Sequence, residues 1–311
     1  MTMKLLKSDF NSIKTWMHRN ARPLDLARWN YHFENGSGEN VLTYLQAYQN
    51  QDGGFGHALE PDSWNPNSTP IQTTTAIEIL EEIHFDDKQH LLIQQILNFL
   101  ESGTDFEEGR WQNTVSSNNH YPHAPWWHTD SDSNSRREYN PTAILAGFIL
   151  AFSDKGSDLF SEGFNLSQEL SKSFLLQPQL DMHPLLCVQH MLAYIKKAEI
   201  QNHFEYYSLC KLLDQQITHL INRDADHWND YGCRPTTFIK SPDNPAYKEN
   251  KEIVDRELDY LLNTRNADGV WDITWKWSSF NKEFAISENW WKANVVIKNT
   301  LLLQAFGRFE A

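Results

Sequence analysis

The chain has 311 residues, with 27 Lys or Arg and 41 Asp or Glu, so its formal net charge at pH 7 is −14. That charge disfavours binding to nucleic-acid phosphates or to an anionic membrane surface. The longest apolar run, residues 143–152, is half as long as a membrane-spanning helix requires. The three cysteines do not make a disulfide framework, and the first ten residues contain no signal-peptide core. We therefore expect a cytoplasmic protein that binds no nucleic acid and spans no membrane.

A short loop motif recurs along the chain. Asn50-Gln51-Asp52-Gly53-Gly54-Phe55 follows one apolar, periodic segment, and Asn266-Ala267-Asp268-Gly269-Val270-Trp271 follows another. Residues 223–228 and 109–111 are weaker copies. Each copy reads as a polar helix end, a turn and an aromatic residue, so we predict loops that connect pairs of helices.

In chain order, the helices that follow these loops begin at a Ser, Thr or Asn cap or at a Pro. They are predicted over residues 71–80, 142–152, 185–195 and 289–305, and a further start at Pro235 precedes only a short segment. The helices before the loops carry polar residues on one face, such as Gln94 and Glu257, whereas residues 144–152 and 185–192 are apolar nearly all round. Exposed helices alternating with buried ones predict an all-α fold. We expect an α/α toroid of five to six helical hairpins, with inner and outer helix rings, in a single domain over residues 1–311.

Residues 44–56 and 265–271 resemble the repeat of protein prenyltransferase β subunits and of squalene–hopene-type terpenoid cyclases. The resemblance implies the toroid fold, a central aromatic cavity for an isoprenoid and, as in the prenyltransferases, a helical protein partner. The catalytic motifs of these families are missing. The chain has no Asp-x-Asp-Asp acid, Asp86-Asp87-Lys88-Gln89-His90 departs from the magnesium motif at its fifth residue, and residues 69–72 and 140–142 contain no Cys for zinc.

Four carboxylates are candidate catalytic residues. Glu60 and Asp62 lie in a loop that we expect to be extended, where they would hold a cation, act as acid and base, or remain solvated near a helix start. Glu138 and Glu288 precede equivalent helices. In a toroid both would face the central mouth as an acid/base pair, or they would serve only as helix caps.

A polar insert over residues 113–137 is rich in His and Trp and is expected to be a binding loop. The candidate ligand-binding residues in and after it are His123, Trp126, Trp127, His128, Tyr139 and Asn140. The His spacing fits no standard zinc template, and residues 130–141 lack the Gly and Glu of a calcium loop. His183, Cys187 and His190 share a helix face beside Leu and Val, which favours packed core over a metal site. We assign no metal ligand and leave the cofactor unknown.

The chain contains 12 tryptophans, and a cluster near its C-terminal end supplies further candidate ligand-binding residues, Trp275, Trp277, Trp290 and Trp291. Aromatic rings stabilise carbocations, stack on sugar rings or simply fill a core. Three functions therefore stay open. They are an isoprenoid-binding or isoprenoid-transforming protein, a carbohydrate-active enzyme (glycoside hydrolase or lyase) with paired carboxylates, and a non-catalytic toroid that binds a protein partner.

Overall fold

The computed structural model describes residues 3–130, 138–176 and 179–310. Within these ranges the chain forms eleven α-helices and one two-stranded hairpin, and about 60% of it is helical. The all-α prediction is therefore confirmed. The chain divides into two compact units: unit 1 comprises Met1–Tyr44 and Ile217–Ala311, and unit 2 comprises Leu45–Gln216.

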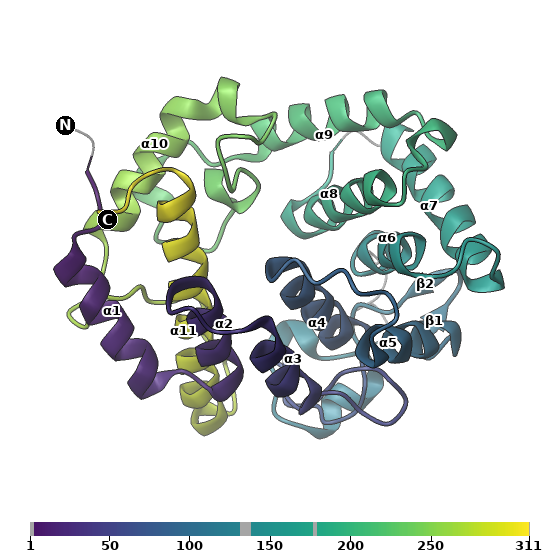
Figure 1. Cartoon of the computed structure of the whole chain (residues 1–311), viewed down its shortest axis with the longest axis horizontal. Helices are drawn as coiled ribbons and strands as arrows, with labels where there is room; N and C mark the ends of the chain where they lie inside the picture. Colours follow the sequence, from purple (N-terminus) through teal and green to yellow (C-terminus); the bar gives the residue numbers. More distant parts are fainter. Residues whose placement is uncertain (1–2, 131–137, 177–178, 311) are drawn as a thin grey trace. The chain divides into compact units, whose positions relative to one another are not determined.

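Unit 2 is built around one completely buried helix, α6 (Thr142–Phe152), whose eleven residues are all buried as its apolar sequence predicts. α6 packs against α7 and α8 and also contacts α4 and α5 (Figure 1). The approach of α8 is close, because a Cβ added at Gly147 would lie 3.0 Å from the Cα of Met191. The other elements are α4 (Pro70–Glu82), α5 (Leu91–Glu101), α7 (Asp158–Leu176), α8 (Met182–Lys197), β1 (Phe106–Glu107) and β2 (Arg110–Trp111).

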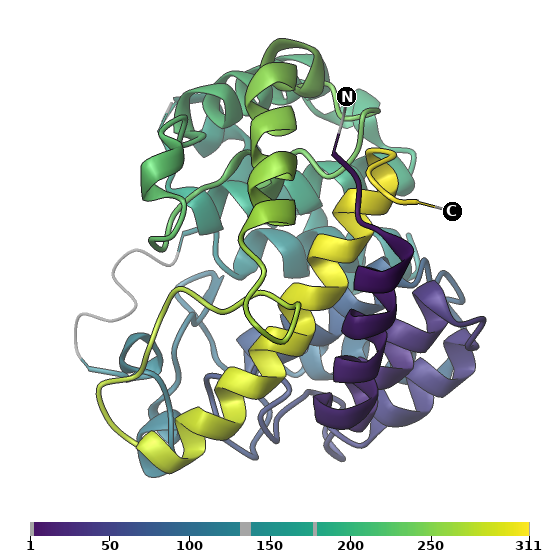
Figure 2. The same ribbon diagram turned by 90° about the vertical axis from the view of Figure 1, so that its left-hand side faces the viewer.

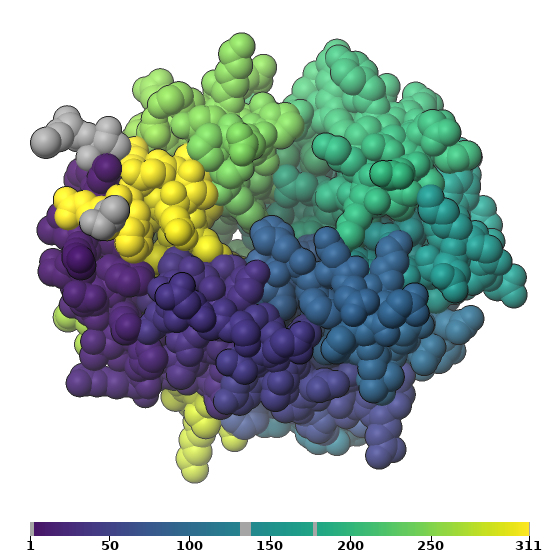
Figure 3. Space-filling model, in the orientation of Figure 1, coloured from purple at the N-terminus to yellow at the C-terminus, as the bar shows by residue number. Residues whose placement is uncertain are grey.

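Unit 1 brings the two ends of the chain together. Its helices are α1 (Lys7–Asn20), α2 (Pro23–Phe33), α10 (Tyr247–Asn263) and α11 (Asn281–Ala305), while α3 (Gly38–Gln46) and α9 (Tyr206–Leu220) each continue from one unit into the other. α11 packs against α1, α2 and α10, and Figure 2 shows it running beside α1. Leu5 pairs with Phe309 in a parallel bridge, and the last segment lies against the first on the face seen in Figure 3.

The predicted helix starts agree with the structure for α4 and α6, whereas α8 and α11 begin before their predicted starts. α4 begins at Pro70 behind an N-cap, because the Thr69 hydroxyl accepts a hydrogen bond from the Gln72 N–H at 3.1 Å. α6 covers the predicted residues 142–152, and α8 contains the predicted residues 185–195 but begins earlier, at Met182. After Pro235 the structure has only the 3₁₀ turn Pro235–Thr237. α11 begins at Asn281, so Glu288 lies inside that helix and not at its start.

Both full copies of the loop motif adopt the same turn, which we call clasp 1 (residues 50–55) and clasp 2 (residues 266–271). In clasp 1 the Asn50 N–H donates to the Gly54 carbonyl at 2.9 Å and the Gly53 N–H donates to the Asn50 carbonyl at 3.0 Å. Clasp 2 has the same two bonds, from Asn266 to Val270 at 2.7 Å and from Gly269 to Asn266 at 2.9 Å. The central glycines have φ of +89° and +81°, which explains why the motif requires glycine there.

The weaker copies of the motif fold differently. Ala225–His227 is a short 3₁₀ helix, and Arg110–Trp111 is strand β2. Neither copy has both the Asp and the adjacent Gly of a clasp.

Candidate functional site

Glu60 and Asp62 lie in a tight turn whose carboxylates are removed from solvent. The Ser63 N–H donates to the Glu60 carbonyl at 3.1 Å, with Pro61 between them, so the expected extended loop is wrong at this position. Only 7% of Glu60 and 2% of Asp62 is exposed, which contradicts the alternative of solvated acids. Asp and Glu are almost never this buried unless they are paired with another group.

Strained backbone precedes these carboxylates. The Leu59 N–H donates to the Gly56 carbonyl at 3.2 Å, and the two residues between them, His57 and Ala58, have φ of +60° and +59°. Non-glycine residues seldom adopt this conformation, and two in succession require support from the surrounding structure. The fully buried Gln72 of α4 provides it, since its Oε1 accepts from the Leu59 N–H and its Nε2 donates to the Asn65 carbonyl, both at 2.9 Å.

The insert forms the other side of this turn. The Ala124 N–H donates to the Asp62 carbonyl at 2.8 Å, and the Trp64 N–H donates to the Pro122 carbonyl at 2.9 Å. Asn118 ties the two segments together through its side chain, because its Oδ1 accepts from Asn65 Nδ2 at 2.9 Å. We call this assembly of residues 56–72 and 117–129 the acid turn site.

His123 and His128 form a stacked pair at the acid turn site. The rings are 5.5 Å apart with an interplanar angle of 14°. His123 is buried, and its Nδ1 lies 2.6 Å from the Tyr121 carbonyl, so this nitrogen carries a proton. Its Nε2 lies 3.3 Å from Nδ1 of His128, so the two imidazoles are within hydrogen-bond distance of each other.

Two tryptophans of the insert lie beside these histidines in the chain. Trp126 is 43% exposed, whereas Trp127 is half-buried and its carbonyl accepts from Asn118 Nδ2 at 3.1 Å. The Nε1 atom of Trp127 is buried and has no hydrogen-bond partner among the described residues. Part of the predicted insert, residues 131–137, lies outside the described residues.

Glu138, Tyr139 and Asn140 belong to the same unit and lead into α6. Tyr139 is buried, and burial together with the Glu138 carboxylate raises the pKa of its hydroxyl above the ordinary value. Its hydroxyl has no hydrogen-bond partner among the described residues. The Asn140 Oδ1 accepts from the Cys187 thiol at 3.5 Å. These residues therefore join the start of α6 to α8.

The three residues of α8 that share a face, His183, Cys187 and His190, lie in different environments: His183 is exposed, His190 is half-buried and Cys187 is buried. His190 Nδ1 lies 2.7 Å from a Glu81 oxygen of α4, and burial raises the pKa of the Cys187 thiol. Among the described residues, no group of three or more His, Cys, Asp or Glu side chains is arranged to hold a metal ion.

Glu288 has a structural partner. Its carboxylate lies 3.0 Å from Lys292 Nζ one helical turn later, and Lys292 also lies 3.0 Å from Asp272. Burial opposes protonation of Lys292, but the hydrogen bonds to Glu288 and Asp272 raise its pKa overall. Because Glu288 is in unit 1 and Glu138 is in unit 2, their pairing across a cavity stays a prediction.

The C-terminal tryptophans occupy different environments. Trp277 is buried and packs against Phe284 with ring centroids 5.6 Å apart, as expected of core. Trp275 meets Trp291 edge to face at 5.3 Å. The Arg22 guanidinium lies over the Trp290 ring at 5.3 Å, and Arg22 also bonds to the buried Asp25 at 2.7 Å.

Sequence reasoning missed the fully buried carboxylate of Glu257, because the helical pattern placed this residue on a polar face. Its oxygens accept from the N–H and the hydroxyl of Thr236 at 2.6 and 2.7 Å, and Arg234 Nε lies at 3.4 Å. Burial raises the pKa of Glu257, although Arg234 and Thr236 oppose this effect. The helical pattern gave no signal of this burial, because the residues that cover Glu257 lie in the distant 3₁₀ turn at Pro235–Thr237.

Comparisons with known proteins add no assignment: no family model, no curated protein and no solved structure matches this chain. None of the helices that the structure describes has the length and apolar character needed to cross a membrane.

Proposed function

We propose that the protein is a carbohydrate-active enzyme in which Glu60 and Asp62 act as general acid and base. The observation that carries this proposal is the burial of both carboxylates within one turn whose strained approach is held by Gln72. Backbone strain of this kind gathers at functional sites. A positioned carboxyl group can pass a proton to or from a substrate, and a pair of carboxyl groups is what most glycoside hydrolases use.

The side chains around the acid turn site favour a neutral, hydroxyl-rich substrate. Asn65, Gln72 and Asn118 are buried amides at its core, and His123 adds an imidazole. These amides bond to one another and to the backbone, so the core of the site is polar and unsuited to a hydrocarbon chain. The exposed ring of Trp126 supports the same class, because an indole face stacks on a pyranose ring.

An isoprenoid-binding or isoprenoid-transforming toroid is the second candidate function. Two observations favour it: the two clasps share their backbone bonds, as expected of a family repeat, and Arg22 lies over Trp290, which places a cation beside an aromatic face. In this proposal the helices form the inner and outer rings of an α/α toroid, and the ligand would occupy an aromatic cavity. The cytoplasmic location and the helical protein partner likewise stay predictions.

The experiment that separates the two functions is a ligand panel on the full chain. Thermal unfolding is measured with tetrasaccharides of several linkages and with prenyl diphosphates, each with and without Mg²⁺ or Zn²⁺, and released reducing ends or unsaturated sugars are measured in parallel. We expect a rise in the unfolding midpoint with a saccharide, because a ligand that binds only the folded state stabilises it. A rise with prenyl diphosphates alone would overturn the carbohydrate proposal in favour of the second candidate.

A further inference from the structure

An open groove of about 490 Å³ lies on unit 1, between α1 and clasp 2. Its volume falls within the range of about 300–1,000 Å³ that is usual for small-molecule sites. Residues spaced along one face of α1 line it, and the tip of clasp 2 closes one side; the lining includes Asn11, Thr15, Trp16, Arg19 and Asp268. The opposite face of α1 buries Ile13 and Met17 in unit 1.

Comparison of the two clasps shows that the Asp268 side chain makes none of the hydrogen bonds that the equivalent Asp52 makes. In clasp 1 the equivalent residue, Asp52, accepts from the Gly54 N–H at 3.0 Å and from the Ser68 hydroxyl at 2.6 Å. In clasp 2 the Val270 N–H bonds instead to the Asn266 side chain at 3.2 Å. Within the described residues the Asp268 carboxylate makes no hydrogen bond or ion pair, so it remains available at the rim of the groove.

Three side chains of α1 that face the groove are equally available. The Asn11 amide, the Trp16 indole and the Arg19 guanidinium make no side-chain hydrogen bond, ion pair or ring contact within the part of the chain that the structure describes. The groove thus presents an aromatic face together with a carboxylate, a guanidinium and an amide. The opposite charges of Arg19 and Asp268 balance, which favours a neutral ligand over an anion.

We propose that this groove is a saccharide-binding site separate from the acid turn site. Trp16 stacks on the apolar face of a sugar ring, while Asp268 accepts from sugar hydroxyls and Arg19 and Asn11 donate to them. The choice of ligand class rests on the proposed carbohydrate function, but the binding chemistry does not depend on the acid/base roles of Glu60 and Asp62. Such a site holds a polymer on the enzyme while another part of it is cleaved.

The test is native affinity electrophoresis of the full chain in gels that contain soluble starch, xylan, β-glucan, mannan or glycol chitin. Wild type is compared with Trp16→Ala, Asp268→Asn and the control Tyr207→Ala, which removes a side chain that is 81% exposed on α9. We expect at least one polysaccharide to retard wild type and the control, with an apparent Kd about tenfold or more weaker for Trp16→Ala. Circular dichroism confirms that each variant is folded.

Two outcomes would overturn the inference: no retardation of wild type by any of the five polysaccharides, or equal retardation of wild type and both groove variants. Cleavage of a tetrasaccharide, measured on the same proteins, reports separately on the acid turn site. If no glycan is cleaved but retardation still depends on Trp16, the proposed enzymatic function fails while the groove remains a sugar-binding site. If cleavage occurs and retardation is independent of Trp16, only the groove proposal fails.

Discussion

Acidic residues in this protein lie in contrasting surroundings. Asp25 is fully buried but bonds to Arg22 and Arg28 at 2.7 and 3.0 Å. Asp105 has the opposite environment, because burial and the carboxylates of Glu107 and Asp52 raise its pKa to about 6. The same residue type therefore stabilises the fold at one position and weakens it at another.

Asp105→Asn should stabilise the protein above pH 6. Because the folded-state pKa of Asp105 is raised above the ordinary 3.8, the folded state loses stability as the pH rises from about 4 through about 6. Asn does not ionise and tolerates the φ of +55° at this position. We expect a gain of about 1 kcal/mol at pH 7.5, after allowing for solvent screening, and none at pH 3.5.

Urea unfolding at the two pH values checks this prediction. Asp154→Asn is the control, since Asp154 is exposed. An equal change at both pH values would contradict the assigned cause.

The two clasp aspartates should differ in their contribution to stability. Asp52→Ala removes the acceptor for the Gly54 N–H and the Ser68 hydroxyl and should cost about 1–3 kcal/mol. Asp268→Ala should change the free energy of unfolding by less than about 0.5 kcal/mol, because no fold contact is lost. Equal losses in chemical denaturation would show that Asp268 also has a structural role.

At the scale of elements, local signals predict helices well and buried loops poorly. The start of α4 was predicted from the Thr69 cap and Pro70, and α6 was predicted from its apolar run, residues 142–152. Both predictions succeeded because the signal for each helix lies in its own residues. Ser287-Glu288 resembles a helix start, but residues 281–286 are also helical and Ser287 is buried. A Ser-Glu pair is thus weak evidence for a helix start when no Pro or Gly precedes it to end the helix on its N-terminal side.

The acid turn site could be predicted only in part. Its carboxylates and aromatic insert are visible in the sequence, but their burial depends on contacts such as Asn65 to Asn118, across 53 residues. Periodicity carries no information about such long-range loop contacts. For the same reason, the contact between the turn at Glu60 and the segment at His123 could not be predicted from periodicity.

The glycines of the two clasps should tolerate alanine differently. Both have positive φ, so each substitution costs backbone strain of about 1 kcal/mol. A Cβ at Gly53 would also lie 2.0 Å from the Gln95 carbonyl oxygen of α5, whereas one at Gly269 meets nothing closer than the Ser12 Cβ at 3.7 Å. We expect Gly53→Ala to be destabilising by at least about 2 kcal/mol more than Gly269→Ala in urea unfolding. Equal losses of unfolding free energy for the two variants would contradict this prediction, because they would mean that α5 can move away from residue 53 without destabilising the protein.

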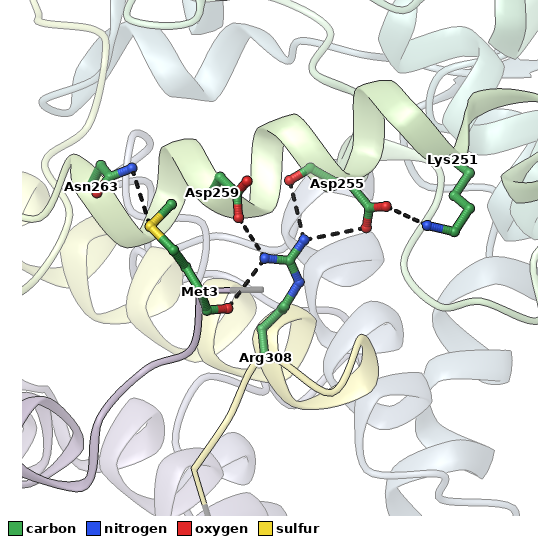
Figure 4. Close-up of polar contacts among 6 residues, drawn as sticks. All are labelled: Met3, Lys251, Asp255, Asp259, Asn263 and Arg308. Carbon is green, nitrogen blue, oxygen red and sulfur yellow. Dashed lines mark hydrogen bonds and ion pairs between the residues drawn. The ribbon is translucent and has the colours of Figure 1, made fainter. Parts of the chain in front are cut away.

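At the scale of the whole chain, Arg308 joins the two ends of unit 1 (Figure 4). It is 5% exposed and bonds to Asp259 at 2.5 Å, to Asp255 at 3.3 Å and to the Met3 carbonyl at 3.2 Å. The guanidinium reaches all three groups at once because its donors form a planar fork.

Arg308→Ala should destabilise the protein by about 1–3 kcal/mol, because two carboxylates of α10 lose their cation in a partly buried setting. Arg308→Lys should recover only part of this loss. The control is Arg256→Ala, on the exposed surface of the same helix. Thermal and urea unfolding measure the differences, and a loss no greater than that of the control would contradict the role of Arg308 in holding the chain ends.

The measurement that tests the central claim most directly is kcat/KM for Glu60→Gln and Asp62→Asn on the glycan that the ligand panel identifies. Glu101→Gln, on the exposed end of α5, is the matched control, and the unfolding free energy is measured for each protein. We predict a loss of about 100-fold or more for both site variants, with the folded state retained and the control unchanged. Activity within about twofold of wild type in either folded variant, or no cleavage of any glycan by wild type, would contradict the assignment of Glu60 and Asp62 as acid and base.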